Sequence, residues 1–335
     1  MPFAKLPKVE LHLHLDCSLS YEAVVELRPD ISLERYREDF VAPPKCRDLA
    51  DFLTRPPRFT ALMQDAKGLT VATHDLFHQL RKDQVIYAEI RFAPLLHTDD
   101  GMTPEEVVRV VDRETSRASA ETGIEARLIL CTLRHFDERQ GLATAQLAEQ
   151  FKNSMVTALD LAADEAGFPI DAHVAAFEWA RRHGLECTAH AGEALGPESV
   201  WETLEKLKPK RIGHGVRSIE DPTLVKLLKE RDIHLEICPS CNVQIDVFDT
   251  MADHPIKRLY DQGISVGINT DGRTISDIDL TGEYERLAET FGWGNNEFLR
   301  CNLNALHAAF LPQNDKQWLE RRMLEAYCEI GVESK

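Results

Sequence analysis

Short apolar runs alternate along this chain with longer segments of helical periodicity. The segment 196–207 illustrates the second kind, because Val200, Leu204 and Leu207 recur at helical spacing behind Pro197. Strand and helix patterns that alternate without a hairpin signal indicate a parallel sheet. Eight strand–helix units predict an α/β fold of the (β/α)8 TIM-barrel type, although periodicity by itself also allows an open, doubly wound sheet. The expected strands are residues 9–15, 85–92, 126–132, 156–161, 185–189, 211–213, 234–237 and 265–269.

One connection is too long for a simple crossover. About seventy residues separate the first two expected strands, and Pro56 and Pro57 break this segment into pieces. Insertions at a barrel mouth often cover a site, so we expect a helical lid over about residues 20–80. An insertion without such a role is the alternative. No linker, repeat or low-complexity tract divides the chain, so we expect a single domain over residues 1–335.

Composition narrows the classes of partner. The formal net charge is −17, and apolar residues make up 43% of the chain. Phosphate binding needs clustered Lys and Arg, so this charge argues against nucleic acid and fits a neutral or cationic small molecule. We expect no membrane span and no secretory signal, because no long apolar run occurs. Eight cysteines in 335 residues do not suggest a disulfide scaffold, which favours reduced thiols and a cytoplasmic location. Nothing indicates the oligomeric state.

Polar residues suited to metal binding stand at the ends of several expected strands. His12 and His14 are two apart on the first strand and therefore point to the same face. His190 and Asp271 follow two other apolar strands. Three imidazoles and one carboxylate on one rim predict a site for zinc or a similar divalent ion, and barrel enzymes place their chemistry on that rim. Taken alone, the first pair also fits two polar residues in a barrel interior.

Two more residues belong to the same rim. His214 in RIGHG and Glu193 in HAGE each stand where an expected strand meets its loop. A single residue of this kind would mean little. Six of them, on four strands of one predicted barrel, favour an active site over packing.

Other potential ligands fit structural roles better. His74 and His78 are four apart on an amphipathic helix that we place on the outside of the barrel. The pair Cys238 and Cys241 has C-x-x-C spacing but no second pair, which argues against a zinc ribbon. We interpret His234 as a buried polar group with satisfied hydrogen bonds.

Seven motifs together resemble those of the adenosine deaminases. They occur in the same order as in that family, and the resemblance extends from about residue 7 to about residue 330. The motifs are LHLHLD, AEIRFAP, LDLAADE, HAGE, RIGHG, EICPSCN and INTDGRTIS. The resemblance implies a (β/α)8 barrel that holds one zinc ion through His12, His14, His190 and Asp271.

The resemblance also implies roles in catalysis. Glu193 would protonate the purine ring, and His214 and Asp271 would act on the attacking water. The substrate would be bound by His14, Asp16 and the residues at positions 163 and 272, with Asp16 on a ribose hydroxyl. The chemistry requires such a set, because deamination of an aromatic ring needs a strong nucleophile and a proton on the ring. A bound metal lowers the pKa of water to roughly 7, and a buried carboxylic acid supplies the proton.

Three positions depart from the pattern that many members of the family share. Gly272 stands where many have a second Asp, Ala163 where many have Gly, and Cys17 where many have Gly. Loss of one buried hydrogen bond to substrate would weaken transition-state binding by roughly 1–3 kcal/mol. Arg273 and Thr274 are candidates to replace the missing carboxylate.

We therefore predict a zinc-dependent deaminase that converts adenosine or deoxyadenosine to inosine or deoxyinosine and ammonia. One alternative keeps the site but changes the substrate to adenine or to a modified nucleoside such as aminodeoxyfutalosine. Another is a catalytically inactive barrel that binds a nucleoside.

Overall fold

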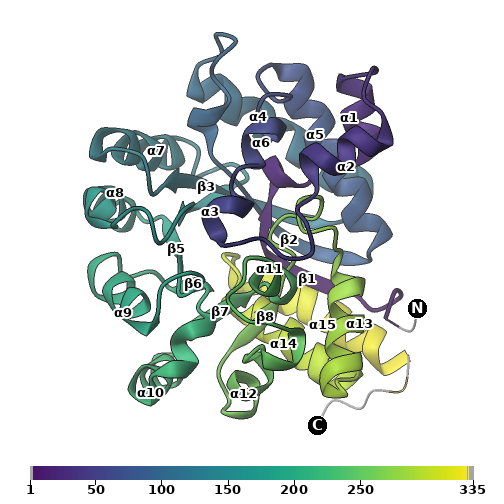
Figure 1. Cartoon of the computed structure of the whole chain (residues 1–335), viewed down its shortest axis with the longest axis vertical. Coiled ribbons are helices and arrows are strands. Elements are labelled where there is room, and N and C mark those ends of the chain that lie inside the picture. The colour runs from purple at the N-terminus through teal and green to yellow at the C-terminus, as the bar shows by residue number, and fades with distance from the viewer. Residues whose placement is uncertain (1–2, 330, 332–335) are drawn as a thin grey trace.

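The eight strands close into a barrel. The computed structural model describes residues 3–329 and 331. Its strands follow one another in the order β1-β2-β3-β4-β5-β6-β7-β8 (Figure 1), and each neighbouring pair is parallel. β8 and β1 meet through a bridge between Leu13 and Asp271. This closure confirms the predicted TIM barrel and rules out an open sheet.

The strands lie close to where the apolar runs predicted them, and no end differs by more than two residues. They are β1 (Lys8–His14), β2 (Val85–Phe92), β3 (Glu125–Leu133), β4 (Val156–Ala162), β5 (Glu186–Ala191), β6 (Arg211–His214), β7 (His234–Ile237) and β8 (Val266–Ile268).

Helices surround the strands and connect them. The α-helices are α1 (Tyr21–Leu27), α2 (Leu33–Phe40), α3 (Leu49–Phe52), α4 (Pro56–Thr60), α5 (Ala66–Lys82), α6 (Pro104–Thr122), α7 (Glu138–Gln150), α8 (Val174–Arg182), α9 (Pro197–Lys206), α10 (Pro222–Glu230), α11 (Pro239–Gln244), α12 (Ile256–Asp261), α13 (Leu280–Phe291), α14 (Asn295–Ala308) and α15 (Gln313–Glu329). Short 3₁₀ helices are η1 (Leu15–Cys17), η2 (Pro94–Leu96), η3 (Asp171–His173), η4 (Val216–Glu220) and η5 (Met251–Asp253).

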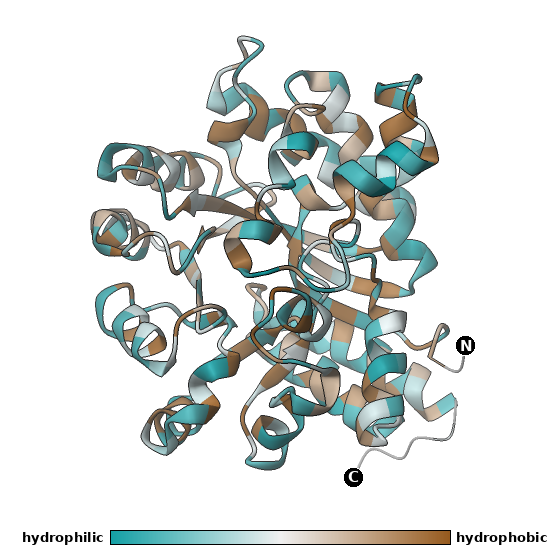
Figure 2. Cartoon of the chain, viewed as in Figure 1, coloured by the Kyte–Doolittle hydropathy of each residue, from teal (hydrophilic) through white to brown (hydrophobic). Residues whose placement is uncertain are grey.

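Hydropathy follows this layering. The central strands are largely hydrophobic, whereas the outer helices carry many hydrophilic residues (Figure 2). Amphipathic helices bury one face against the sheet and leave the other to solvent. Across residues 3–329 and 331, no helix is both long enough and apolar enough to cross a membrane.

The long connection between β1 and β2 is helical, as predicted. It contains α1 to α5, and Pro56 occupies the first turn of α4. Leu49 and Phe52 from α3 and Thr60 from α4 line a cavity at the barrel mouth. The insertion therefore forms part of the wall of that cavity. Its action as a moving lid stays a prediction.

The barrel interior contains a buried network of charges. Arg91 on β2 donates to Asp160 on β4 over 2.9 Å and to Glu236 on β7 over 2.6 Å. Arg211 on β6 donates to the same Glu236 over 2.7 Å and also to Glu89 on β2. All five side chains are buried. Because a buried charge is costly unless it is paired, this mutual pairing lets the barrel carry carboxylates beneath the residues at its rim.

Candidate active site

The four predicted metal ligands converge at the C-terminal ends of the strands. Nε2 of His12 lies 3.1 Å from Oδ1 of Asp271, and Nε2 of His14 lies 3.4 Å from the same oxygen. Nε2 of His190, on β5, is 3.3 Å from Nε2 of His14. The structure thus brings together one oxygen and three nitrogens from strands that are far apart in the sequence. Their action as ligands stays a prediction.

The chemistry of this cluster fits a divalent cation. Nε2 of His12 is buried and has no hydrogen-bond partner within the described part of the chain. Burial lowers the pKa of His14 to about 4 despite the nearby Asp271 carboxylate, so its imidazole is neutral at pH 7 and can act as a ligand. Neutral imidazoles and a carboxylate are the donors that zinc prefers.

His214 also reaches the cluster. The ligand atoms of His12, His190, His214 and Asp271 all lie within 4.8 Å of one another. Nε2 of His214 is 3.1 Å from a carboxylate oxygen of Glu193. Distance alone therefore does not decide whether His214 belongs to the metal shell or to the reacting groups.

Two carboxylates that sequence analysis missed orient the ligand histidines. Asp160 lies 3.2 Å from Nδ1 of His190, and Glu236 lies 3.0 Å from Nδ1 of His12. A carboxylate on the far nitrogen fixes the ring of a metal-binding histidine and makes it a better ligand. Burial opposes a charged His190, but the Asp160 carboxylate outweighs it and raises the pKa of His190 to about 9, so a cation that binds Nε2 would displace a proton from this ring. The signal in the sequence was a charged residue inside each of two otherwise apolar strands.

Glu193 has the environment of a carboxylic acid that stays protonated. It is buried, and this burial, together with the charges of Glu165 and Asp271, raises its pKa to about 8 against the opposing influence of His190. A bound cation would lower this pKa again, because it favours the carboxylate form.

The loop that carries Glu193 is held by a second carboxylate, Glu165, which sequence analysis also missed. Glu165 accepts hydrogen bonds from the main-chain N–H groups of Gly192, Glu193 and Ala194 over 2.6, 3.0 and 2.6 Å. It accepts another from Leu195 N–H over 2.8 Å. The hydroxyl of Ser199 donates to it as well. Glu165 therefore provides the acceptor for main-chain N–H groups that find none within the tight turn after β5.

Three residues at the rim have a left-handed backbone without being glycine. The φ angles of Ala163, His214 and Asp271 are 80°, 59° and 66°. Such conformations cost of order 1–3 kcal/mol each and cluster at functional sites. The barrel imposes this geometry on two of the predicted catalytic residues and on one predicted substrate-binding residue.

A cavity of about 430 Å³ opens beside the cluster. All four predicted substrate-binding residues line it, namely His14, Asp16, Ala163 and Gly272. Among the described residues that line it, none is Lys or Arg, and Asp99 and Asp164 add negative charge. Among the described residues, the cavity wall therefore has no Lys or Arg side chain that could bind a phosphate group.

Gly272 and Cys17 fill one wall of this cavity together. A Cβ atom at position 272 would lie 2.7 Å from Cβ of Cys17 and 2.5 Å from Cγ2 of Ile275. A side chain at position 272 would therefore collide with both Cys17 and Ile275 unless they moved. Two of the departures from the family pattern are thus sterically coupled.

The candidates to replace the missing carboxylate do not do so. Arg273 donates to Glu10 over 2.6 Å and to Asp83 over 3.0 Å, away from the cavity. The Thr274 hydroxyl donates to the carbonyl of Leu19 over 2.6 Å. Neither residue lines the cavity, so this expectation was wrong. Arg273 thus holds the loop after β8 onto β1 through Glu10, and Thr274 holds it onto the segment that follows β1.

The remaining candidates have structural surroundings. His74 lies 3.0 Å from Glu114, and His78 is exposed on α5. Nδ1 of His234 bonds to Ser265, but its Nε2 has no partner within residues 3–329 and 331, so its hydrogen bonding is only half satisfied. The thiol of Cys241 donates to Asp271 over 3.0 Å, a contact that sequence analysis did not anticipate.

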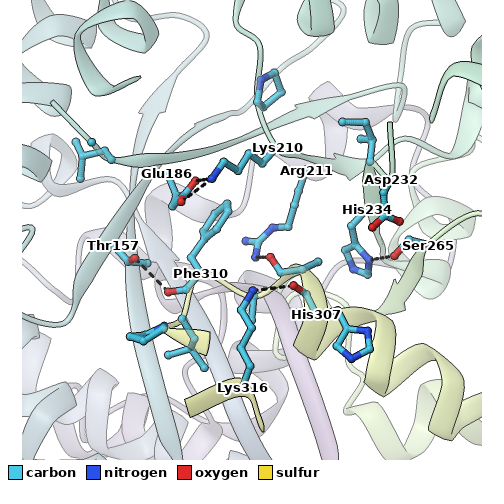
Figure 3. Close-up of a pocket in the computed structure, with 18 of the residues that line it drawn as sticks. Thr157, Glu186, Lys210, Arg211, Asp232, His234, Ser265, His307, Phe310 and Lys316 are labelled. Atoms are coloured by element: carbon cyan, nitrogen blue, oxygen red, sulfur yellow. Dashed lines mark hydrogen bonds and ion pairs between the residues drawn. The ribbon is translucent and has the colours of Figure 1, made fainter. Parts of the chain in front are cut away.

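A larger cavity of about 760 Å³ lies at the opposite end of the barrel (Figure 3). Its charged groups are mostly paired internally. Lys210 pairs with Glu186 over 2.7 Å, Arg211 is held by interior carboxylates, and Lys316 donates to the carbonyl of His307 over 2.7 Å. The smaller cavity carries the reactive groups, so size does not identify the site here.

Comparisons with known proteins identify the family of this chain. A sequence model of the family described as adenosine deaminase matches residues 7–326. The adenosine deaminases of Enterococcus faecalis and Haemophilus ducreyi are 35% and 36% identical to this chain, each over 96% of it and 97% of their own length.

Solved structures share the fold. The adenine deaminase of Arthrobacter aurescens superposes with a TM-score of 0.87 at 26% identity, covering 97% of this chain and 99% of that one. An amidohydrolase of Burkholderia ambifaria with bound Zn gives 0.89 at 21% identity, covering 98% and 92%. The N6-mAMP deaminase of Arabidopsis gives 0.86 at 23% identity, covering 96% and 98%.

Proposed function

We propose, since the chain belongs to the adenosine deaminase family, that it hydrolyses the 6-amino group of adenosine or deoxyadenosine to give inosine or deoxyinosine and ammonia. The observation that carries this proposal is the position of Glu193. A buried acid with a raised pKa faces the same cavity as the imidazoles of His14 and His190 and the carboxylate of Asp271.

The family implies a metal ion, and we propose zinc, held by His12, His14, His190 and Asp271. When bound, zinc would supply a water molecule that loses its proton near neutral pH. Asp160 and Glu236 would hold the rings of His190 and His12 in the orientation for binding.

The protein's own groups would perform the remaining steps. Glu193 would give its proton to a ring nitrogen. Protonation lets that nitrogen accept the electron pair displaced from the attacked carbon. Asp271 would accept the proton of the attacking water, and His214, 3.1 Å from Glu193, would contact the attacking oxygen. Asp16 lies on the cavity wall, where it would meet a ribose hydroxyl.

We propose that the substrate carries no phosphate, because the cavity lacks Lys and Arg in the described chain. The N6-mAMP deaminase of Arabidopsis shares the fold at 23% identity, so the two substrate classes must be separated by the cavity wall rather than by the barrel. A nucleotide phosphate would meet Asp99 or Asp164 instead of a cation.

A second candidate substrate is adenine or another aminated ring. The wall formed by Cys17 and Gly272 is the observation that supports this candidate. Burial raises the pKa of the Cys17 thiol well above its ordinary value, so this wall presents a neutral thiol instead of a carboxylate. A thiol is a weak hydrogen-bond donor. Ring recognition along this wall would therefore be less selective.

A substrate panel tests these proposals. Zinc-loaded protein would be assayed for ammonia and for the shift in purine absorbance with adenosine, deoxyadenosine, adenine, aminodeoxyfutalosine and AMP. We expect turnover of adenosine with no detectable turnover of AMP. A higher kcat/KM for adenine would favour the second candidate. Stoichiometric nucleoside binding with no ammonia from any compound would instead indicate an inactive binding barrel.

We also propose a cytoplasmic location, supported by the cysteines. All eight are free and seven are buried, as expected in a reducing compartment. Recovery of the native protein in a cell fraction other than the cytoplasm would contradict this.

A further inference from the structure

A chain of buried hydrogen bonds ends on His214. The main-chain N–H of Ile256 donates to Nδ1 of His254 over 3.1 Å. Nε2 of His254 lies 3.2 Å from Oδ1 of Asn242, and Nδ2 of Asn242 lies 3.0 Å from Nδ1 of His214. We call Ile256, His254 and Asn242 the histidine relay. The side chains of Asn242, His254 and His214 are all buried.

The first group of the relay fixes the protons of all the others. A main-chain N–H can only donate, so Nδ1 of His254 must accept. Burial lowers the pKa of His254 to about 3, so its ring is neutral and carries its single proton on Nε2. That proton points at Asn242, which must present its oxygen to His254 and its NH₂ group to His214. Nδ1 of His214 is then an acceptor.

We propose that the histidine relay holds the proton of neutral His214 on Nε2, which makes His214 a hydrogen-bond donor at the reaction centre and bars it from the metal shell. An imidazole that accepts a hydrogen bond at Nδ1 carries its single proton on Nε2 and is neutral. A nitrogen that carries a proton cannot also bind a metal ion.

The relay thereby distinguishes the role of His214 from that of His14, although both lie near Asp271. Nε2 of His14 lies 3.4 Å from Oδ1 of Asp271, and a ring nitrogen of His214 lies within 4.8 Å of the ligand atoms of Asp271, His12 and His190. Within the described residues, nothing donates to Nδ1 of His14 as Asn242 donates to that of His214. His14 is therefore free to present a bare Nε2 to a cation.

The relay also determines whether His214 donates or accepts a hydrogen bond at the reacting oxygen. This step of the inference rests on the proposed function. His214 can stabilise negative charge on the attacking oxygen by donating from Nε2, but it cannot take the proton of the water at that atom. Asp271 is left as the acceptor. Asn242 and His254 are positioning residues in this scheme, because neither lines the cavity.

Nuclear magnetic resonance of ring-nitrogen-labelled histidine tests the relay directly in the zinc-loaded protein. The His214 signals would be assigned by their loss in His214→Gln. We expect His214 to show a neutral ring protonated on Nε2 across the neutral pH range. A ring protonated on Nδ1, or a signal typical of metal coordination, would overturn the proposal.

A matched pair of variants gives a second test. His254→Gln keeps an N–H donor for the Asn242 oxygen, whereas His254→Leu removes it and frees the amide to rotate. We expect His254→Leu to lower kcat by about 10- to 100-fold with little change in KM, and His254→Gln to stay within a few-fold of wild type. Equal effects of the two variants would count against the relay.

Asn242→Asp reverses the last bond of the relay. Its carboxylate would accept a proton from Nδ1 of His214, so the labelled ring should change to the form protonated on Nδ1 while the protein stays folded. An unchanged His214 signal in this variant would refute the assignment. The resonance measurements do not require turnover, so failure of the relay and failure of the deaminase proposal are distinguishable.

Discussion

Glu165 offers the most quantitative test of how the Glu193 loop is held. Replacement of Glu165 by Ala removes the acceptor for four main-chain N–H groups, those of residues 192–195, and for the Ser199 hydroxyl. Each buried donor left without a partner costs about 1–3 kcal/mol. Two of these hydrogen bonds are only partly buried, so we take the lower end of the range, which sums to about 4 kcal/mol for the four donors.

Glu165→Gln should be milder. Its remaining oxygen can take the position that receives the N–H groups of Glu193, Ala194 and Leu195. The side-chain NH₂ group of the Gln would then face the main-chain N–H of Gly192. Gly192 would lose its acceptor, and two hydrogen-bond donors would point at each other. We expect a cost of about 1–3 kcal/mol.

Thermal unfolding and steady-state kinetics measure the effect. At about 2 °C per kcal/mol for a chain of this size, Glu165→Ala should lower Tm by about 8 °C or more, and Glu165→Gln by a few degrees. Misplacement of Glu193 should lower kcat/KM by about 100-fold in the Ala variant. Glu230→Ala on the exposed face of α10 is the control and should change neither quantity. A Glu165→Ala protein with wild-type Tm and kcat/KM would refute the reasoning.

The remaining predictions concern the metal, the acid and the cavity wall. His12→Ala should lower the zinc content of the purified protein, and full zinc occupancy in this variant would contradict its assignment as a ligand. Burial raises the pKa of Glu193 to about 8, so its acid form is present below that pH and lost above it. A plot of kcat/KM against pH should therefore fall on its alkaline side. Bound metal would lower this pKa and shift that fall to lower pH. Glu193→Gln should keep its metal and lose nearly all turnover, and wild-type activity would remove Glu193 from its role. Gly272→Asp should be destabilised by contact with Cys17 and Ile275, and the double variant with Cys17→Gly should regain part of the lost stability; equal Tm values for the single and double variants would contradict this coupling.

The fold could be predicted because each strand is a short apolar run and each connection has helical spacing. Closure could not be derived from these patterns alone. It depends on the bridge between Leu13 and Asp271, in which a residue beyond the last strand pairs with the first. An open sheet would show the same alternation along the sequence.

The convergence of the six predicted site residues could be foreseen because each stands at or just after the end of an apolar strand. Their supporting residues could not, since support depends on which interior positions share a layer of the barrel. Asp160 reaches His190 and Glu236 reaches His12 only after closure. The coupling of Cys17 and Gly272 is also a packing property, because the two residues meet only where β8 joins β1.

The most direct test of the central claim is the position of the metal. An anomalous difference map recorded at the zinc absorption edge from crystals of the zinc-loaded protein would locate it. We predict one peak within bonding distance of Nε2 of His12, His14 and His190 and of a carboxylate oxygen of Asp271, with His214 outside that distance. A peak elsewhere, or one coordinated by His214 instead of His14, would contradict the account.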